Sequence, residues 1–305
     1  MKVLIIGGVA AGTKVAAKLK REDRSCEVTI LTKGKDISYA GCGLPYYVGG
    51  LISTREQLIV NTPESFSRLT GAKVQTETEV TAVDTGAKTV TAVHKGETKT
   101  WSYDKLVIAS GASPFRPQIE GLDLENVFFM RTPDDAIVLR AAVEAGGIKR
   151  AVVAGGGFIG LEVAENLAEK GVRVNVIDFA PHVLPNFLDP EMSEYVENRM
   201  SEAGVNPMTG VALEAILGDG RVEKVQTSRR AIKADAVVIA IGIRPNTAFL
   251  EGTGIEMFKG TILTDKYMCT NVEDVYAVGD CAMVTNRETG EPAWSPMGST
   301  ANIAG

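Results

Sequence analysis

Short apolar runs that end in glycine recur along the chain and predict buried strands. The first run, Val3–Ile6, continues into Gly7-Gly8-Val9-Ala10-Ala11-Gly12, and Thr13–Glu22 is then compatible with a helix. A short, fully apolar run is typical of a strand that is covered on both faces. Strand, glycine turn and helix in this order favour phosphate binding, because backbone N–H groups at the helix start point at the anion. Val9 stands where the middle glycine of a G-x-G-x-x-G motif belongs.

A second copy of this pattern lies about 150 residues further along the chain. The run Ala151–Ala154 leads into a glycine turn, and Leu161–Lys170 follows as a predicted helix. Gly155, Gly157 and Gly160 fill all three glycine positions of the motif. Two copies in the same setting make an accidental match improbable, so we predict two dinucleotide sites.

The two copies differ in the residues that follow their second strands. The predicted strand Glu27–Leu31 ends at Thr32 and Lys33, whereas Arg173–Ile177 ends at Asp178, about 20 residues after the first glycine. An acid at that position accepts hydrogen bonds from the adenosine ribose and repels a 2′-phosphate. The sequence therefore predicts that the second site prefers NADH to NADPH, and the first site lacks the usual acid.

The segments between and after the two copies complete the pattern. Alternating apolar residues over 73–93 and 99–103 predict a small antiparallel sheet. Leu106–Gly111 and Val237–Gly242 are buried runs that end beside prolines, so we expect matched crossings between domains. The last run, Val275–Asp280, ends in Gly-Asp and is expected to point towards the first site, where Asp280 would accept hydrogen bonds from a polyol.

This order predicts an α/β fold of two nested Rossmann-like dinucleotide-binding domains with small antiparallel insertions. We expect residues 1–115 and 245–305 to form one domain and residues 116–244 to form the other. In such sheets, ligands bind at the carboxyl ends of parallel strands.

Composition fits this interpretation and excludes several functions. The chain has 305 residues, 45% of them hydrophobic and 23% charged, which suits about two globular domains. A formal net charge of −6 argues against binding to nucleic acid or to anionic membranes. No run approaches the roughly 18 apolar residues that a membrane span requires. Four scattered cysteines without a CxxC motif, together with two histidines, predict neither a metal site nor a disulfide framework, and favour a reducing, cytoplasmic location.

One cysteine lies in a distinctive stretch, Ser38-Tyr39-Ala40-Gly41-Cys42-Gly43-Leu44-Pro45-Tyr46-Tyr47. Pro45 suits the first turn of a helix, where its missing N–H costs nothing. Cys42 would then lie near a helix N-terminus, whose dipole favours thiolate over thiol. The alternative is an unreactive, half-buried thiol in a loop.

The segments GGVAAG, SYAGCGLPYY, IASGASP, GGGFIGLE, AIGIRPN and YAVGDCA occur in the order found in FAD-dependent pyridine nucleotide–disulfide oxidoreductases. The chain resembles that family from Met1 to Gly305. It is most similar to the single-cysteine branch, which includes CoA-disulfide reductases, NADH oxidases, NADH peroxidases and persulfide reductases.

The resemblance implies FAD in the first domain and NADH in the second. It implies FAD contacts at Gly7, Val9, Ala10, Gly12, Thr32, Lys33, Ser110, Gly111, Arg131, Gly279 and Asp280. It implies NADH contacts at Gly155, Gly157, Phe158, Ile159, Gly160, Glu162, Asp178 and Gly242, with Glu162 near the nicotinamide. From the residues alone, Arg131 is equally a surface ion-pair partner.

The resemblance also narrows the chemistry expected of Cys42. Dithiol members carry a second cysteine five residues away, but Ile37 and Tyr47 occupy those positions here, so Cys42 would cycle as a thiolate and a sulfenic acid or mixed disulfide. Peroxidase-type and water-forming oxidase relatives place a histidine where this chain has Ala10. That difference favours a disulfide or persulfide substrate.

Arg21 and Ser38 match positions that bind CoA in such reductases, although a basic helix end such as Arg21 is as often simply solvated. We therefore expect an NAD(P)H-dependent reductase of a small, possibly CoA-linked disulfide or persulfide, with electrons passing from NADH to FAD to Cys42. The alternatives are an NADH oxidase that forms hydrogen peroxide and a flavoprotein electron carrier or redox sensor. Relatives continue into a C-terminal domain that dimerises, and this chain stops before it.

Overall fold

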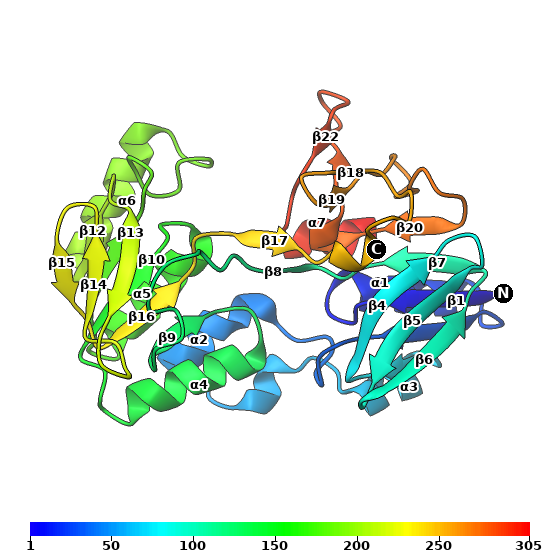
Figure 1. The fold of residues 1–305 in the computed structure, drawn as a ribbon, viewed down its shortest axis with the longest axis horizontal. Helices are drawn as coiled ribbons and strands as arrows, with labels where there is room; N and C mark the ends of the chain where they lie inside the picture. Colours follow the sequence, from blue (N-terminus) through cyan, green and yellow to red (C-terminus); the bar gives the residue numbers. More distant parts are fainter. The chain divides into compact units, whose positions relative to one another are not determined.

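The computed structural model describes residues 1–305, and the chain forms two units (Figure 1). The first unit comprises Met1–Tyr39, Ile59–Ser113 and Arg244–Gly305, and the second unit comprises Ala40–Leu58 and Pro114–Ile243. The chain passes into the second unit through β8 (Ala112–Pro114) and returns through β17 (Ile243–Pro245). In sequence, most of the second unit therefore lies between two parts of the first.

Five parallel strands form the main sheet of the first unit, in the spatial order β20–β7–β1–β2–β3. The side chains of Val3–Ile6 in its central strand are at most 5% exposed, as an apolar run without alternation requires. The strands are β1 (Lys2–Ile6), β2 (Glu27–Leu31), β3 (Lys73–Gln75), β7 (Lys105–Ile108) and β20 (Val275–Ala277).

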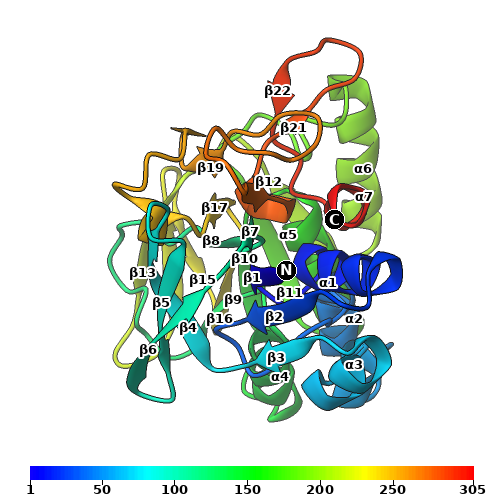
Figure 2. The same cartoon turned by 90° about the vertical axis from the view of Figure 1, so that its right-hand side faces the viewer.

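The first unit also contains helices and short antiparallel strands. Figure 2 shows α7 (Gly298–Ala304) beside α1 (Ala11–Glu22). Thr62 caps α3 (Pro63–Thr70), because its hydroxyl accepts the Ser65 N–H and Pro63 occupies the first turn. The antiparallel strands are β4 (Thr78–Asp84), β5 (Thr89–His94), β6 (Glu97–Ser102), β18 (Met257–Phe258), β19 (Thr261–Ile262), β21 (Val284–Thr285) and β22 (Pro292–Ala293).

The second unit repeats this plan around a parallel sheet of order β9–β16–β10–β11–β12. Its parallel strands are β9 (Val127–Phe129), β10 (Arg150–Ala154), β11 (Arg173–Ile177), β12 (Val205–Met208) and β16 (Ala236–Ile239). Its antiparallel strands are β13 (Leu213–Leu217), β14 (Lys224–Thr227) and β15 (Ala231–Lys233). Its helices are α2 (Leu44–Gly49), α4 (Pro133–Glu144), α5 (Phe158–Glu169) and α6 (Pro190–Glu202).

The two sheets have corresponding strand orders, and each unit inserts three antiparallel strands at the same point of its sequence. In the first unit these strands lie between β3 and β7, and in the second between β12 and β16. The predicted α/β fold class with two Rossmann-like sheets is confirmed.

Two details differ from the sequence-based expectation. Lys73–Gln75 is not part of the antiparallel sheet, because it pairs in parallel with β2 as an edge strand. Residues 40–58, which carry Cys42, belong to the second unit because α2 packs against α4 and α5. The chain contains no helix with the length and apolar character needed to cross a membrane.

Candidate functional site

The first candidate site is the edge of the first sheet at which its strands end. Gly7 follows β1 with φ of +107°, and a Cβ there would lie 2.0 Å from the carbonyl oxygen of Ala109. At Gly12, in the first turn of α1, a Cβ would lie 1.9 Å from the carbonyl oxygen of Gly7. Only glycine fits these two positions, so the turn runs tightly into α1. The start of such a helix offers backbone N–H groups to a pyrophosphate.

Two further strands bring predicted residues to the same edge. Ser110 and Gly111 follow β7, and Gly279 and Asp280 follow β20. Gly279 has φ of +79°, and a Cβ there would lie 3.1 Å from the Cβ of Ala11, which puts the Gly-Asp pair at the start of α1. The hydroxyl of Ser110 is buried beside the Cys281 thiol, a weak hydrogen-bonding group, and has no nitrogen or oxygen partner. Since an unpaired buried polar atom costs about 1–3 kcal/mol, a polar ligand group fits here.

The remaining predicted residues of this site have local roles in the structure. Val9 and Ala10 lie half-buried in the glycine turn. Thr32 is 7% exposed and its N–H donates to the carbonyl of Gln75, so it belongs to the sheet edge. Lys33 Nζ donates to Glu79 Oε1 at 2.8 Å. The acid that usually binds the ribose is absent after β2, but the carboxylate of Glu79 on β4 lies beside Lys33. The sequence pattern did not identify this carboxylate.

The second candidate site has the same construction. Gly155 follows β10 with φ of +114°, and a Cβ there would lie 2.3 Å from the carbonyl oxygen of Ala240. A Cβ at Gly160 would lie 1.9 Å from the carbonyl oxygen of Gly155. Gly157 and Gly242, in contrast, face open space, because no protein atom lies within 4 Å of a Cβ at either position. At Gly242 the φ of +124° favours glycine by itself, so Gly157 alone is left for an approaching ligand to explain.

A loop after the second strand returns to the glycine turn in each unit. In the second unit, Asp178 Oδ2 accepts the N–H of Gly156 at 2.6 Å, and Leu184 N–H donates to the Gly156 carbonyl at 3.0 Å. In the first unit, Ser38 N–H donates to the carbonyl of Gly8 at 3.0 Å. Ser38 and Leu184 have positive φ values of 47° and 50°, which are strained for residues other than glycine.

An aromatic pair lies at the start of α5. The rings of Phe158 and Phe187 have centroids 4.7 Å apart at an angle of 53°, and the two residues are 45% and 63% exposed. Ile159, the next residue of α5, is 38% exposed. Sequence reasoning identified Phe158 and Ile159 but missed Phe187, whose only signal was an aromatic residue in the loop that follows Asp178.

Cys42 lies in a single turn of 3₁₀ helix, Gly41–Gly43, directly before α2. Pro45 occupies the first turn of α2, as predicted. Cys42 is exposed, and it is the one cysteine of the second unit. Cys26 and Cys281 are buried in the first unit, where Cys269 is partly buried. Burial raises the pKa of the Cys281 thiol and keeps it protonated.

Glu162, the acid predicted near the nicotinamide, lies on α5, which packs against α2. Burial, and then the charge of Glu165, raises the pKa of its carboxyl. The charge of Glu162 is in turn the main cause that raises the pKa of Tyr46, four residues after Cys42. Between these helices lies a cavity of about 140 Å³ lined by Tyr46, Leu51, Glu165, Asn166 and Glu169.

Three predicted residues, Arg21, Ser38 and Arg131, do not form one group with the others. Arg21 is exposed in the last turn of α1, about 15 Å along the helix axis from the glycine turn to which Ser38 is bonded. Arg131 belongs to the second unit, next to the capping box of α4, whereas the other residues predicted to bind FAD belong to the first. Its role at the flavin remains a prediction.

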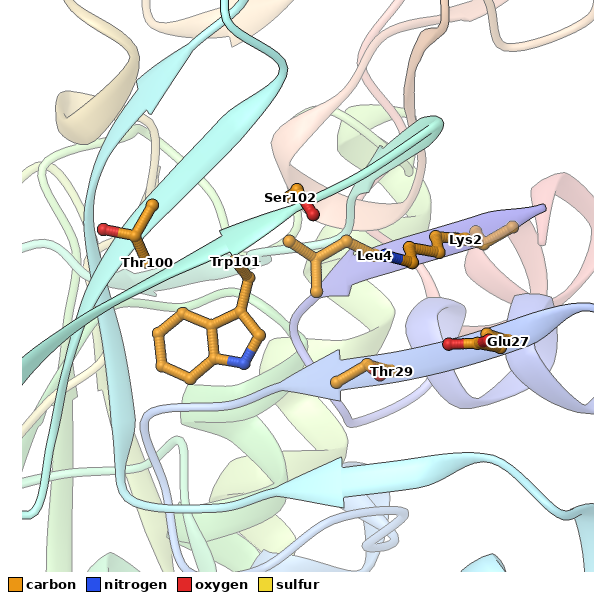
Figure 3. Close-up of a pocket in the computed structure, with 8 residues that line it drawn as sticks. Lys2, Leu4, Glu27, Thr29, Thr100, Trp101 and Ser102 are labelled. Atoms are coloured by element: carbon orange, nitrogen blue, oxygen red, sulfur yellow. The ribbon is translucent and has the colours of Figure 1, made fainter.

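A separate hollow of about 270 Å³ lies in the first unit (Figure 3). Trp101 forms one wall, and Lys2 and Glu27 lie at the amino ends of β1 and β2. The glycine turn lies at the opposite ends of these strands. This hollow is therefore not part of the candidate nucleotide site.

A family model described as pyridine nucleotide-disulphide oxidoreductase matches residues 1–299. The chain is 38% identical over 302 residues to an NADH oxidase of Methanocaldococcus jannaschii, covering 99% of this chain and 67% of the relative. It is 37% identical over 305 residues to an NAD(P)H coenzyme A polysulfide/persulfide reductase of Pyrococcus horikoshii, covering 100% of this chain and 68% of the relative.

Among solved structures, an NAD-dependent persulfide reductase from A. fulgidus matches with a TM-score of 0.96 and 38% identity. The match covers 100% of this chain and 57% of that one. The chain therefore spans about two thirds of these curated relatives and rather more than half of the solved one.

Proposed function

Because the chain belongs to the pyridine nucleotide-disulphide oxidoreductase family, we propose that it is an NAD(P)H-dependent flavoprotein that reduces a small disulfide or persulfide. The observation that carries the proposal is Cys42, an exposed thiol before α2 and the one cysteine of its unit. A thiol without a neighbouring cysteine reacts with a substrate sulfur and not with a dithiol partner. The similarity to the reductases of Pyrococcus horikoshii and A. fulgidus supports this substrate class.

The two glycine turns fit the two nucleotides that this function needs. Gly7, Gly12 and the buried hydroxyl of Ser110 would hold FAD in the first unit. Gly157, Asp178 and Gly242 would hold NADH in the second, where Asp178 disfavours a 2′-phosphate. Together the bound nucleotides supply two electrons, taken as a hydride from NADH, for the reduction of sulfur.

Cys42 performs the sulfur chemistry. Its thiolate attacks one sulfur of the substrate, so that a mixed disulfide forms and the first substrate thiol leaves. Two electrons then break the mixed disulfide, which restores the Cys42 thiolate and releases the second thiol. Over the whole cycle, disulfide, NADH and one proton become two thiols and NAD⁺.

The distance between Arg21 and the glycine turn indicates how long the substrate would be. A span of about 15 Å along α1 is too long for a small disulfide, but it suits an extended, phosphate-bearing thiol such as CoA. Arg21 would then bind a phosphate of the substrate and Ser38 a group further along it. Arg21→Gln should raise KM for CoA disulfide and leave KM for a small aromatic disulfide unchanged.

A titration of the FAD-loaded protein with NADH tests the redox role of Cys42. Uptake of two reducing equivalents before the flavin bleaches is expected in the wild type, and Cys42→Ser should lose that first step. An unchanged titration in Cys42→Ser would rule out the proposed function. Turnover with CoA disulfide, polysulfide and oxygen then identifies the acceptor.

The similarity to an NADH oxidase favours a second candidate, the reduction of oxygen to hydrogen peroxide. That reaction needs only reduced flavin and oxygen, so Cys42→Ser would retain full turnover. A third class, an electron carrier without small-molecule turnover, predicts that none of the three acceptors is consumed.

A further inference from the structure

The helix that follows Cys42 is too short to persist by itself. α2 has six residues, whereas isolated helices shorter than about 12–15 residues are marginal in water. Contacts with the rest of the second unit must therefore hold α2, and with it the turn that presents Cys42. The packing of α2 on α5 is one such contact, and a single arginine of α4 supplies another.

Arg140 binds the end of α2 and the turn after it. Its Nη1 donates to the carbonyl oxygens of Tyr47 at 3.2 Å, Ile52 at 3.3 Å and Ser53 at 3.1 Å. Its guanidinium carbon lies 4.6 Å from the centroid of the Tyr47 ring. Its Nε donates to Glu144 at 2.8 Å, which fixes the side chain on α4.

This arrangement depends on arginine. The Tyr47 carbonyl, which also accepts the N–H of Gly50 at 3.1 Å, belongs to the last turn of α2, where a positive charge complements the helix dipole. A planar guanidinium can stack on the tyrosine and donate at its edge at the same time, whereas a lysine ammonium offers one compact charge. The Arg140 side chain is 19% exposed, so water competes little for these bonds.

We propose that Arg140 is a positioning residue for Cys42. By binding both the end of α2 and the following turn, it fixes the short helix whose amino end presents the thiol. The catalytic consequence rests on the proposed function, whereas the effect on the order of α2 does not. The two parts are therefore tested by separate measurements.

The first measurement is hydrogen exchange of the amides of residues 44–53 in the FAD-loaded full chain. Arg140→Met should speed their exchange about tenfold and leave the amides of β10 unchanged. Arg199→Met is the matched control, because Arg199 pairs with Glu202 on the surface of α6, away from α2. Glu144→Gln, which keeps the three carbonyl bonds, should have a smaller effect. Wild-type exchange in Arg140→Met would overturn the proposal.

The second measurement compares two reactions of the same protein. Turnover of NADH with ferricyanide needs the cofactors alone, whereas disulfide turnover also needs Cys42. Arg140→Met should lower kcat for the disulfide about tenfold and leave the ferricyanide reaction and KM for NADH within twofold. A parallel loss of both reactions would show a merely structural role and overturn the positioning role.

Arg140→Lys, which keeps the charge, provides a folded variant if the methionine variant does not fold, and should give the same pattern at smaller amplitude. Cys42→Ser separates this inference from the proposed function. If Cys42→Ser retained disulfide turnover, the proposed function would fail, and the exchange measurement would still decide whether Arg140 orders α2.

Discussion

Two glycines of the second turn, three residues apart, have different physical roles. A methyl group at Gly160 would collide with the carbonyl oxygen of Gly155, which is backbone and cannot move away. A methyl group at Gly157 would meet no protein atom within 4 Å. The first glycine is required by the fold, and the second leaves room for a ligand.

Gly160→Ala should therefore destabilise the second unit, and Gly157→Ala should not. We expect a loss of about 1–3 kcal/mol in the free energy of unfolding for Gly160→Ala, the usual cost of overpacking. Gly157→Ala should unfold like the wild type but bind NADH at least tenfold more weakly. Gly147→Ala, at another open position, is the control for both measurements. Normal NADH binding by Gly157→Ala would contradict the assignment of this site.

The carboxylate of Asp178 should set the preference between NADH and NADPH. It accepts the backbone N–H groups of Gly156 and Ala180, which fixes its position at the end of β11. Asp178→Asn removes the charge that repels a 2′-phosphate and keeps an oxygen for one of these bonds. We expect kcat/KM for NADPH relative to NADH to rise about tenfold, corresponding to about 1.4 kcal/mol. An unchanged ratio would place the discriminating group elsewhere.

Residue-scale requirements that depend on the local backbone could be predicted from the sequence. Gly7, Gly12, Gly155 and Gly160 were all found because each is needed by its own turn. Phe187 was missed because its role depends on contact with the ring of Phe158, 29 positions earlier, and nothing in its own neighbourhood indicates that contact.

At the scale of elements, α2 and α5 approach each other unusually closely. A Cβ at Gly49 would lie 1.9 Å from Oδ1 of Asn166. Asn166 is 2% exposed, and its Nδ2 donates to the Glu162 carbonyl at 2.8 Å, which limits its freedom to move away. Gly49 is therefore the residue of α2 that packs directly against Asn166 of α5.

Gly49→Ala should push α2 away from α5. We expect a loss of about 1–3 kcal/mol in the free energy of unfolding, measured by denaturant titration. Asn166→Ala in the same chain should recover part of that loss, because the smaller side chain makes room for the added methyl group. Gly147→Ala is again the control, because an added methyl group there meets no protein atom within 4 Å. Strict additivity of the two substitutions would contradict direct contact.

The sequence predicted most strands well and the partners of α2 not at all. Strands such as Val3–Ile6 are recognised from their own apolar residues. α2 contains few apolar residues of helical spacing, and the residues that hold it, Arg140 and Asn166, lie about a hundred positions later. For that reason residues 40–58 were expected in the first unit.

At the scale of the whole molecule, each unit has its own partly exposed ion pairing. In the first unit, Lys105 and Lys88 both donate to Asp274, and Lys105 is the main cause that lowers the pKa of its carboxyl. In the second, Arg150 donates to Asp235 at 2.5 Å and lowers the pKa of that carboxyl. A carboxyl whose pKa is lowered by folding contributes stability above its ordinary pKa, which is lost as pH falls through the lower, folded value.

Asp274→Asn should therefore lower the stability of the folded protein at neutral pH but not in acid. We expect the free energy of unfolding at pH 7 to fall only slightly, because the lysine side chains are 44% and 37% exposed and water screens both ion pairs. The difference from wild type should shrink as pH falls below the ordinary pKa of an aspartate, about 4, and vanish once the carboxyl is protonated in the folded state as well. Thermal unfolding across this range measures it, with Asp219→Asn as a control at an exposed loop. A difference that persisted at low pH would mean that packing, not charge, is responsible.

The membership of residues 40–58 in the second unit has a consequence for how the protein is made. The segment with Cys42 leaves the ribosome about a hundred residues before Arg140 and Asn166, the side chains that hold its helix. At about 5–20 residues per second, the nascent thiol remains on an unstructured segment for roughly 5–20 s. Oxidants and electrophiles present during translation therefore meet this cysteine before the fold has given it a fixed position.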